Sequence, residues 1–256
     1  AIADDGKTVA FESTATNLVR NDTNASPDLF FRSLVLDVYP FPSVDALVAQ
    51  QFADFAGRAP TAAEATEWRA RVVNGEYSTD HVINALAHSA TWSTNRSPVI
   101  RLYWAFFLRK PDAGGLTYWS TKLAGGTSLD QVAASYAASS EFQNTYGALS
   151  NSAFVTLVYE NVLERSPDAA GLAYWTGQLN AGSRTRGQVM AGFSESSEGV
   201  RFLRPQVDII LIYLGMLRTM PLDTTFDSWR ASFAAGVAPE QFVQALRKGA
   251  AYGARV

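Results

Sequence analysis

The stretch RKPDAGGLTYW at Arg109–Trp119 returns as RSPDAAGLAYW at Arg165–Trp175. A shorter pattern that includes part of this signature occurs four times: a proline, a tryptophan eight residues later and a glycine seven residues after that. Its members are Pro60, Trp68, Gly75; Pro111, Trp119, Gly126; Pro167, Trp175, Gly182; and Pro221, Trp229, Gly236. A recurring spacing of this length is typical of a repeat architecture. It predicts four repeats, at about 44–96, 97–150, 151–204 and 205–256.

Each repeat is predicted to contain three helices, about twelve in all. The first helix is apolar and should stop at or just before the proline, which disfavours helix in the residue before it. The second should begin after the proline, where Asp112, Asp168 and Thr61 are placed to cap it, and should end at the glycine. The third ends in a short tail of small and aromatic residues. The predicted fold class is therefore mainly α, an array of three-helix repeats over 44–256.

Residues 1–43 have a different pattern. KTVAFES at Lys7–Ser13 and DLFFRS at Asp28–Ser33 are β-branched and aromatic runs bounded by turn residues, which predicts two strands. LVLDVY at Leu34–Tyr39 is a candidate third strand. The order DDGKTVAFES, ATNLV, NDTN, DLFFR resembles one blade of a TolB-type β-propeller. Because a lone small sheet is marginally stable, this resemblance implies further blades before Ala1.

The two full copies of the signature resemble a bacterial helical domain family of unknown function. That family recurs in exported and surface proteins, including RTX-type calcium-binding proteins and proteins tied to extracellular polysaccharide, and is distantly similar to the phycobilisome linker domain. The resemblance implies an extracellular or cell-surface location and carries over no catalytic residue. The terminal repeats depart from the signature, with Thr61 and Leu222 at the aspartate position and Thr219 at the arginine position.

The composition excludes several classes of function. Hydrophobic residues make up 47% of the 256 residues, which is enough for a packed core. A net charge of −3 gives no basic field for nucleic acid, so no nucleic-acid partner is expected. No apolar run reaches the length of a membrane span. The absence of cysteine excludes disulfides and fits an exported bacterial protein.

Two kinds of residue in the signature are candidates for ligand binding. Tyr118 and Tyr174 could stack on sugar rings, while the tryptophan beside each is better interpreted as a core anchor of its helix. Arg109 and Arg165 could bind a carboxylate of a polysaccharide. The alternative, which we favour, is that each arginine forms an internal ion pair with the aspartate of its own signature.

Metal sites are less well supported. Asp22, Asn24, Ser26 and Asp28 alternate as D-x-N-x-S-x-D, which resembles the start of a calcium loop, although the later glycine and glutamate of such a loop are missing. Simple satisfaction of a turn is the alternative. The two histidines, His81 and His88, are seven residues apart and are interpreted as solvated or core residues rather than as metal ligands.

Three functions remain open. The first is a non-catalytic extracellular module that binds polysaccharide or anchors its parent protein to the bacterial surface. The second is a structural module that assembles with itself or with other surface proteins through the repeats and the β segment. An enzyme acting on glycans ranks last, because the sequence offers no paired carboxylates by spacing and no cofactor beyond possible calcium.

Overall fold

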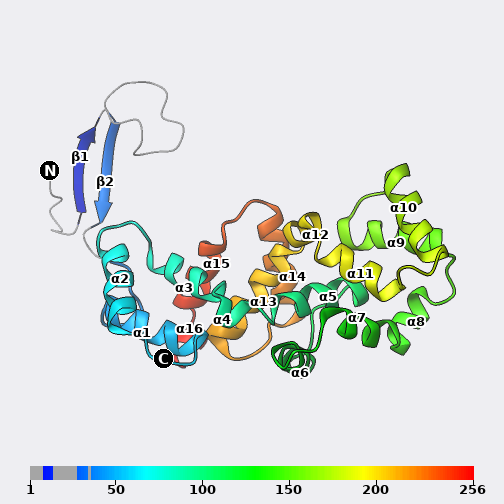
Figure 1. Cartoon of the computed structure of the whole chain (residues 1–256). Helices are drawn as coiled ribbons and strands as arrows, with labels where there is room; N and C mark the ends of the chain where they lie inside the picture. The colour runs from blue at the N-terminus through cyan, green and yellow to red at the C-terminus, as the bar shows by residue number, and fades with distance from the viewer. Residues whose placement is uncertain (1–7, 14–27, 34–35) are drawn as a thin grey trace.

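The computed structural model describes residues 8–13, 28–33 and 36–256. Within these residues the chain is mainly helical, with one two-stranded antiparallel sheet at the N-terminal side (Figure 1). The strands are β1 (Thr8–Ser13) and β2 (Asp28–Ser33), paired so that Thr8 lies opposite Ser33 and Ser13 opposite Asp28. Both predicted strands are thus present.

The candidate third strand, Leu34–Tyr39, is wrong over residues 36–39, and residues 34–35 lie outside the described residues. Leu36–Val38 forms no strand; Leu36 and Val38 instead pack against the helical core, and the Asp37 side chain bonds to Arg247. These residues are held by hydrophobic contacts with the helices and by an ion pair, and within the described residues they form no hydrogen bonds with a neighbouring strand. Residues 36–43 therefore belong physically to the helical part.

Sixteen helices follow in the described residues, rather than about twelve, because the small-residue tail of each predicted repeat forms a short fourth helix. They fall into four successive units of four helices. The first unit comprises α1 (Val44–Phe55), α2 (Ala62–Val73), α3 (Thr79–Ala87) and α4 (Ala90–Ser93). The second comprises α5 (Ser97–Phe107), α6 (Ala113–Ala124), α7 (Leu129–Ala137) and α8 (Ser140–Tyr146).

The third unit comprises α9 (Asn151–Leu163), α10 (Ala169–Asn180), α11 (Arg186–Ser194) and α12 (Ser197–Phe202). The fourth comprises α13 (Arg204–Leu217), α14 (Asp223–Ala234), α15 (Pro239–Lys248) and α16 (Ala250–Gly253). The helix before each proline ends four or five residues short of it. The residue three before the proline takes up left-handed backbone and turns the chain there, at Gly57, Leu108, Glu164 and Arg218.

The predicted glycine stops are confirmed. Gly75, Gly126, Gly182 and Gly236 all follow the second helix of their unit with φ between +66° and +92°, a region that L side chains rarely adopt. The predicted caps are confirmed too, since Thr61, Asp112 and Asp168 each accept a backbone N–H from the first turn of the following helix.

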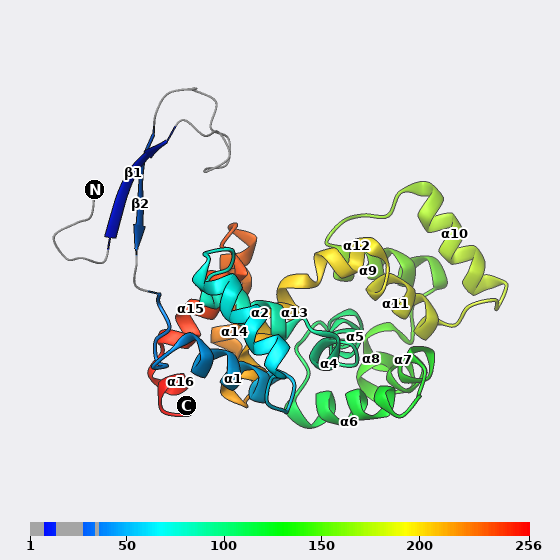
Figure 2. The same ribbon diagram turned by 60° about the vertical axis from the view of Figure 1, so that its left-hand side comes forward.

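The units do not follow one another in space. The fourth unit packs on the first, through α13 and α15 against α3, and also on the second, through α13 against α5. The third packs on the second, through α11 against α5 and α7. The helices therefore form an elongated body with α13 near its middle and α9–α10 at the end far from the termini (Figures 1 and 2). Buried apolar residues from all four units form a single cluster.

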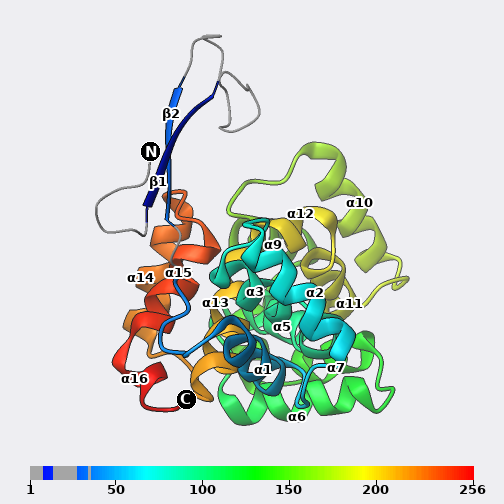
Figure 3. The ribbon, with the colours of Figure 1, turned by 90° about the vertical axis from the view of Figure 1, so that its left-hand side faces the viewer.

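Three buried aspartates fasten the fourth unit to the first. Asp54 pairs with Arg218 at 3.1 Å and with Arg255, Asp80 pairs with Arg247 at 2.8 Å, and Asp208 pairs with His88 at 2.8 Å. Seen from the end of the body, α1 and α2 lie with α15 and α16 near the viewer (Figure 3). The first and fourth units are thus held together by ion pairs whose carboxylates are buried.

Candidate functional site

The aspartate of each full signature is a structural cap. Asp112 accepts the Gly115 N–H at 2.7 Å, and Asp168 accepts the Gly171 N–H at 2.8 Å. The bond from Gly171 lowers the pKa of Asp168, because it favours the charged carboxylate. These two carboxylates are occupied by the start of a helix.

The glycine of each signature makes room for a tyrosine. A Cβ on Gly115 would lie 2.1 Å from the hydroxyl oxygen of Tyr103, and a Cβ on Gly171 would lie 2.3 Å from that of Tyr159. Both tyrosines come from the preceding helix of the same unit and are nearly buried. Glycine is required here by close packing between two helices.

The arginine of each signature is committed to an ion pair, but not with the predicted partner. Arg109 donates to both carboxylate oxygens of Glu141 at 2.9 Å, and Arg165 donates to those of Glu198 at 2.7 and 2.9 Å. The favoured pairing with the aspartate of the same signature is wrong, because that aspartate caps a helix. The pairs lower the pKa of both glutamates. Each ties the turn before the second helix to the short fourth helix.

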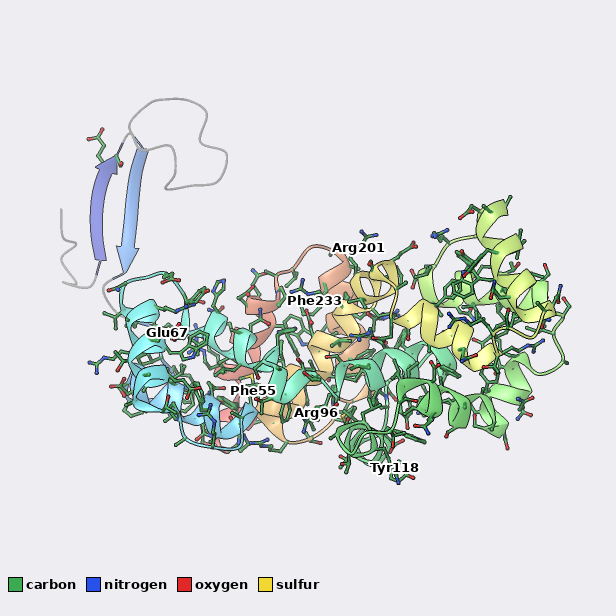
Figure 4. The ribbon with its side chains drawn as sticks, viewed as in Figure 1. Phe55, Glu67, Arg96, Tyr118, Arg201 and Phe233 are labelled. Carbon is green, nitrogen blue, oxygen red and sulfur yellow. The ribbon has the colours of Figure 1, made fainter. Side chains whose placement is uncertain are left out.

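Tyr118 and Tyr174 are exposed, at 54% and 55%. Each contacts the edge of the tryptophan that follows it, with ring centroids 4.9 and 5.0 Å apart. Figure 4 shows Tyr118 at the outer surface of α6. Trp119 and Trp175 are partly buried and pack on aromatic rings of the third helix of their units. The two tyrosines are accessible, and a small depression of about 110 Å³ is lined by Trp175, the ring that Tyr174 contacts.

Two depressions flank α14, the second helix of the fourth unit, and together we call them the α14 groove. The first has a volume of about 420 Å³ and lies between α14 and the signature turn of the second unit. Its floor includes Trp104, whose ring is 5.8 Å from that of Phe226. Lys110 forms an ion pair with Asp223 across it. The lining is Trp104, Leu108, Arg109, Lys110, Pro111, Asp112, Asp223, Phe226 and Asp227.

The second depression, of about 460 Å³, lies between α14, the start of α13 and the end of α9. It shares Asp227 with the first. Between them the Arg230 guanidinium lies over the Trp104 ring, 5.2 Å from its centroid. The lining is Glu164, Phe202, Pro205, Gln206, Asp227, Arg230, Ala231 and Ala234.

Gln206 stands out among these residues. The residue is 4% exposed, and its Oε1 is one of eight side-chain atoms in the described residues that are buried without a hydrogen-bond partner. A buried polar atom without a partner costs about 1–3 kcal/mol, so native structures rarely leave one unexplained. The second depression is the open space that Gln206 borders.

The groove carries charges of both signs. Three cations line it, Arg109, Lys110 and Arg230, against four carboxylates, of Asp112, Glu164, Asp223 and Asp227. Most of these charged groups already form an ion pair or cap a helix within the protein. The arrangement suits hydrogen bonding to an uncharged polar ligand better than capture of an anion.

The remaining candidates are the possible calcium loop and the two histidines. Asp22, Asn24 and Ser26 lie outside the described residues, as does the side chain of Asp28. The Nε2–H of His88 donates to the Asp208 carboxylate at 2.8 Å, and His81 lies 3.7 Å from Glu240. In the part of the chain that the structure describes, no three His, Asp or Glu side chains gather so as to hold a metal ion.

Comparison with known protein families matches residues 133–202 to DUF4214, a domain of unknown function. The matched residues include the signature of the third unit. No curated protein and no solved structure matches the chain. Among the described helices, none is long and apolar enough to cross a membrane.

Sequence reasoning did not find the α14 groove. Trp104 and Gln206 come from the first helices of two different units, and each reads as part of an apolar stretch. The only signal was a glutamine near the start of α13, an otherwise mostly apolar helix. The groove forms because the fourth unit lies against the second and third.

Proposed function

We propose that this chain is a non-catalytic module, exported to the bacterial surface or the extracellular space, that binds polysaccharide in the α14 groove. The observation that supports this most is the pairing of a partly buried indole, Trp104, with polar side chains in two depressions that share Asp227. Aromatic faces stack on the apolar faces of sugar rings, and side chains with both donors and acceptors serve the hydroxyl groups around them.

Two carboxylates of the groove, those of Asp223 and Asp227, favour binding over hydrolysis. Asp223 is 86% exposed at its side chain and paired with Lys110, and Asp227 is 64% exposed beside Arg230. A glycosidase needs one carboxyl group kept protonated by an apolar surrounding. Neither aspartate has such a surrounding, since both face water and a cation.

The test is binding of the full chain to an array of oligosaccharides, followed by calorimetric titration of each hit. Asp227→Ala should weaken binding about tenfold or more, because Asp227 borders both depressions and a charged hydrogen bond contributes about 1.5–3 kcal/mol. Asp45→Ala is the matched control, since Asp45 is exposed on α1, outside the groove.

Tyr118→Ala and Tyr174→Ala test the alternative platform on α6 and α10. If these variants lose glycan binding and Asp227→Ala retains it, the binding site lies at the exposed tyrosines and not in the α14 groove. Absence of binding to every glycan would contradict the proposed function as a whole.

Assembly is a second candidate function, supported by the β1–β2 hairpin. The described residues form a two-stranded sheet of β1 and β2, and the outer edge of such a sheet can accept a strand of another chain. We would measure mass by light scattering across concentration, with and without calcium, for the full chain and for a variant without residues 1–35. If the mass of the full chain alone increases with concentration, assembly through the hairpin is favoured. If the full chain stays a monomer at every concentration, assembly is refuted.

A further inference from the structure

The contact of α3 with α13 and α15 joins the first unit to the fourth, and we call it the α3 seam. We propose that the α3 seam is a pH-sensitive contact, which protonated His88 holds closed and which loosens as the pH rises above neutral. This device is independent of glycan binding in the α14 groove.

Both histidines of the chain lie at the α3 seam. The chain has two histidines and no cysteine. Histidine is the side chain whose ordinary pKa places its change of charge between pH 5 and 8. His81 lies within α3, and His88 is the C-terminal cap of that helix. Both face carboxylates of the fourth unit, since His88 lies 2.8 Å from Asp208 of α13 and His81 lies 3.7 Å from Glu240 of α15.

The two ring nitrogens of His88 both face hydrogen-bond acceptors. Nε2 lies 2.8 Å from Oδ1 of Asp208, and Nδ1 lies 2.8 Å from the carbonyl oxygen of Asn84. A carboxylate and a carbonyl accept and cannot donate, whereas a neutral imidazole has only one N–H. Only the imidazolium can therefore form both hydrogen bonds. Loss of one proton would leave a nitrogen lone pair facing an oxygen lone pair.

Asp208 depends on this bond because its side chain is only 3% exposed. Its other oxygen lies 3.4 Å from Nε of Arg204, whose side chain is 65% exposed. Arg204 belongs to the same helix as Asp208, so this second pair does not join the two units. A buried carboxylate without a close cation carries an uncompensated cost of leaving water. Deprotonation of His88 therefore weakens the link between α3 and α13.

The other charged groups on the helices packed against α3 are committed to ion pairs that do not titrate near neutral pH. These pairs are Asp54 with Arg218 and Arg255, Asp45 with Arg69, Arg247 with Asp80 and Asp37, and Lys248 with Asp37. Glu240 accepts from the side-chain amide of Asn84 at 2.9 Å. The charges that act on His88 are Asp208, which favours its proton, and Arg204, which disfavours it.

The sign of the pH dependence follows from the pKa of His88. The hydrogen bond to Asp208 raises this pKa above its ordinary value, although burial opposes the rise. A raised pKa in the closed contact gives a stabilisation that is complete below about pH 6.5 and disappears as the pH rises through the raised pKa. The α3 seam should therefore be closed in weakly acidic solution and looser in weakly alkaline solution.

The contact between the second and third units is built in the same way without a histidine. There α11 packs against α5 and α7, as α3 packs against α13 and α15. The C-terminal cap of α11 is Glu195, which accepts from Nε of Arg101 on α5 at 2.8 Å. Both groups keep their charge from weakly acidic to weakly alkaline pH. The equivalent link is thus permanent in this half of the molecule and titratable at the α3 seam.

Hydrogen–deuterium exchange of the full chain at about pH 6 and about pH 8.5 compares the two contacts within one molecule. Peptides from residues 79–93 report on α3 and α4, and peptides from residues 186–202 report on α11 and α12. With the intrinsic pH dependence of amide exchange divided out, exchange in 79–93 should accelerate about tenfold or more. One pKa unit between the closed and open contact corresponds to a tenfold change in the opening equilibrium. Exchange in 186–202 should change little.

Two variants test the role of the proton. His88→Gln cannot become charged, so exchange in 79–93 should be fast at both pH values. Asp208→Asn removes the buried charge and should make that exchange independent of pH. His81→Gln is the matched control, because His81 is half exposed and 3.7 Å from its carboxylate, and it should retain the pH response. Unchanged exchange in 186–202 shows that each variant is folded.

Two results would overturn the proposal. The first is an equal effect of pH on both segments of the unmodified chain, which decides the matter even where a variant does not fold. The second is a pH response of 79–93 that persists in His88→Gln or that only His81→Gln removes.

Discussion

Replacement of Arg247 by methionine should destabilise the protein more than replacement of any exposed cation. The Arg247 side chain has no exposed surface, and its Nε donates to Asp80 at 2.8 Å. The same guanidinium donates to Asp37 at 3.2 Å and to the carbonyl of Tyr39. It thereby joins α15 to α3 and to the segment that precedes α1.

The size of the destabilisation follows from the buried carboxylate that the variant leaves without a partner. Asp80 is only 6% exposed, so without Arg247 its carboxylate stays buried with no cation beside it. Removing one partner of a buried ion pair costs about 3–5 kcal/mol. Methionine retains most of the aliphatic volume, so the loss reports mainly on the charge rather than on a cavity.

Urea unfolding at neutral pH measures the effect. Lys248→Met is the matched control, because Lys248 is the next residue, half exposed, and pairs with the same Asp37 at 2.8 Å; exposed pairs contribute about 0–1 kcal/mol. Combining Arg247→Met with Asp80→Asn should recover part of the loss. If Arg247→Met lowers the free energy of unfolding no more than Lys248→Met, the argument from burial is refuted.

The pH dependence adds a second readout of the same cluster. The hydrogen bond from Arg247 holds the pKa of Asp37 at about 2, below its ordinary 3.8. A carboxyl with a depressed pKa in the fold stabilises above its unfolded pKa, and this stabilisation disappears as the pH falls from 3.8 towards 2. Arg247→Met should weaken that acid dependence.

Three further predictions concern other parts of the helical body. Gly126→Ala should cost about 1–2 kcal/mol in urea unfolding, because Gly126 has φ of +92° and no neighbouring atom to clash with, whereas Gly177→Ala, in open space within a helix, should be neutral or stabilising. The hydrogen bond to Asp208 raises the pKa of His88, so its stabilisation should be full at pH below about 6.5 and disappear as the pH rises through the raised pKa; Asp208→Asn should abolish this dependence of the unfolding midpoint. Arg109→Met should change the free energy of unfolding by less than about 1 kcal/mol, since its ion pair is half exposed, and a larger loss would show that the signature turn holds the fold more strongly than its exposure indicates.

The signature illustrates how far sequence reasoning reaches. The caps at Asp112 and Asp168 and the stop at Gly126 depend on atoms three or four residues apart, so residue type and spacing sufficed to predict them. The partner of Arg109 lies 32 residues away, on a short helix that the sequence pattern did not separate from the one before it. The arginine was therefore assigned to the nearer aspartate.

The candidate site shows the limit more sharply. The exposed tyrosines were identified correctly as accessible, since the spacing of Tyr118 and Tyr174 places them off the buried stripe of their helices. The α14 groove was not foreseen, because it joins Trp104 with Gln206, residues from helices of different units. The spacing of the repeats does not indicate which units pack against each other.

The sequence by itself determined the mainly helical fold, the caps at Thr61, Asp112 and Asp168 and the glycine ends of the second helices, because backbone hydrogen bonds and side-chain stripes act within one or two turns. Tertiary structure alone decided that the fourth unit folds back between the first and the second, and that Arg247 meets Asp80 across 167 residues. Such contacts depend on complementary buried surfaces and on charges that must find partners once water is excluded. The groove along α14 is a product of that packing.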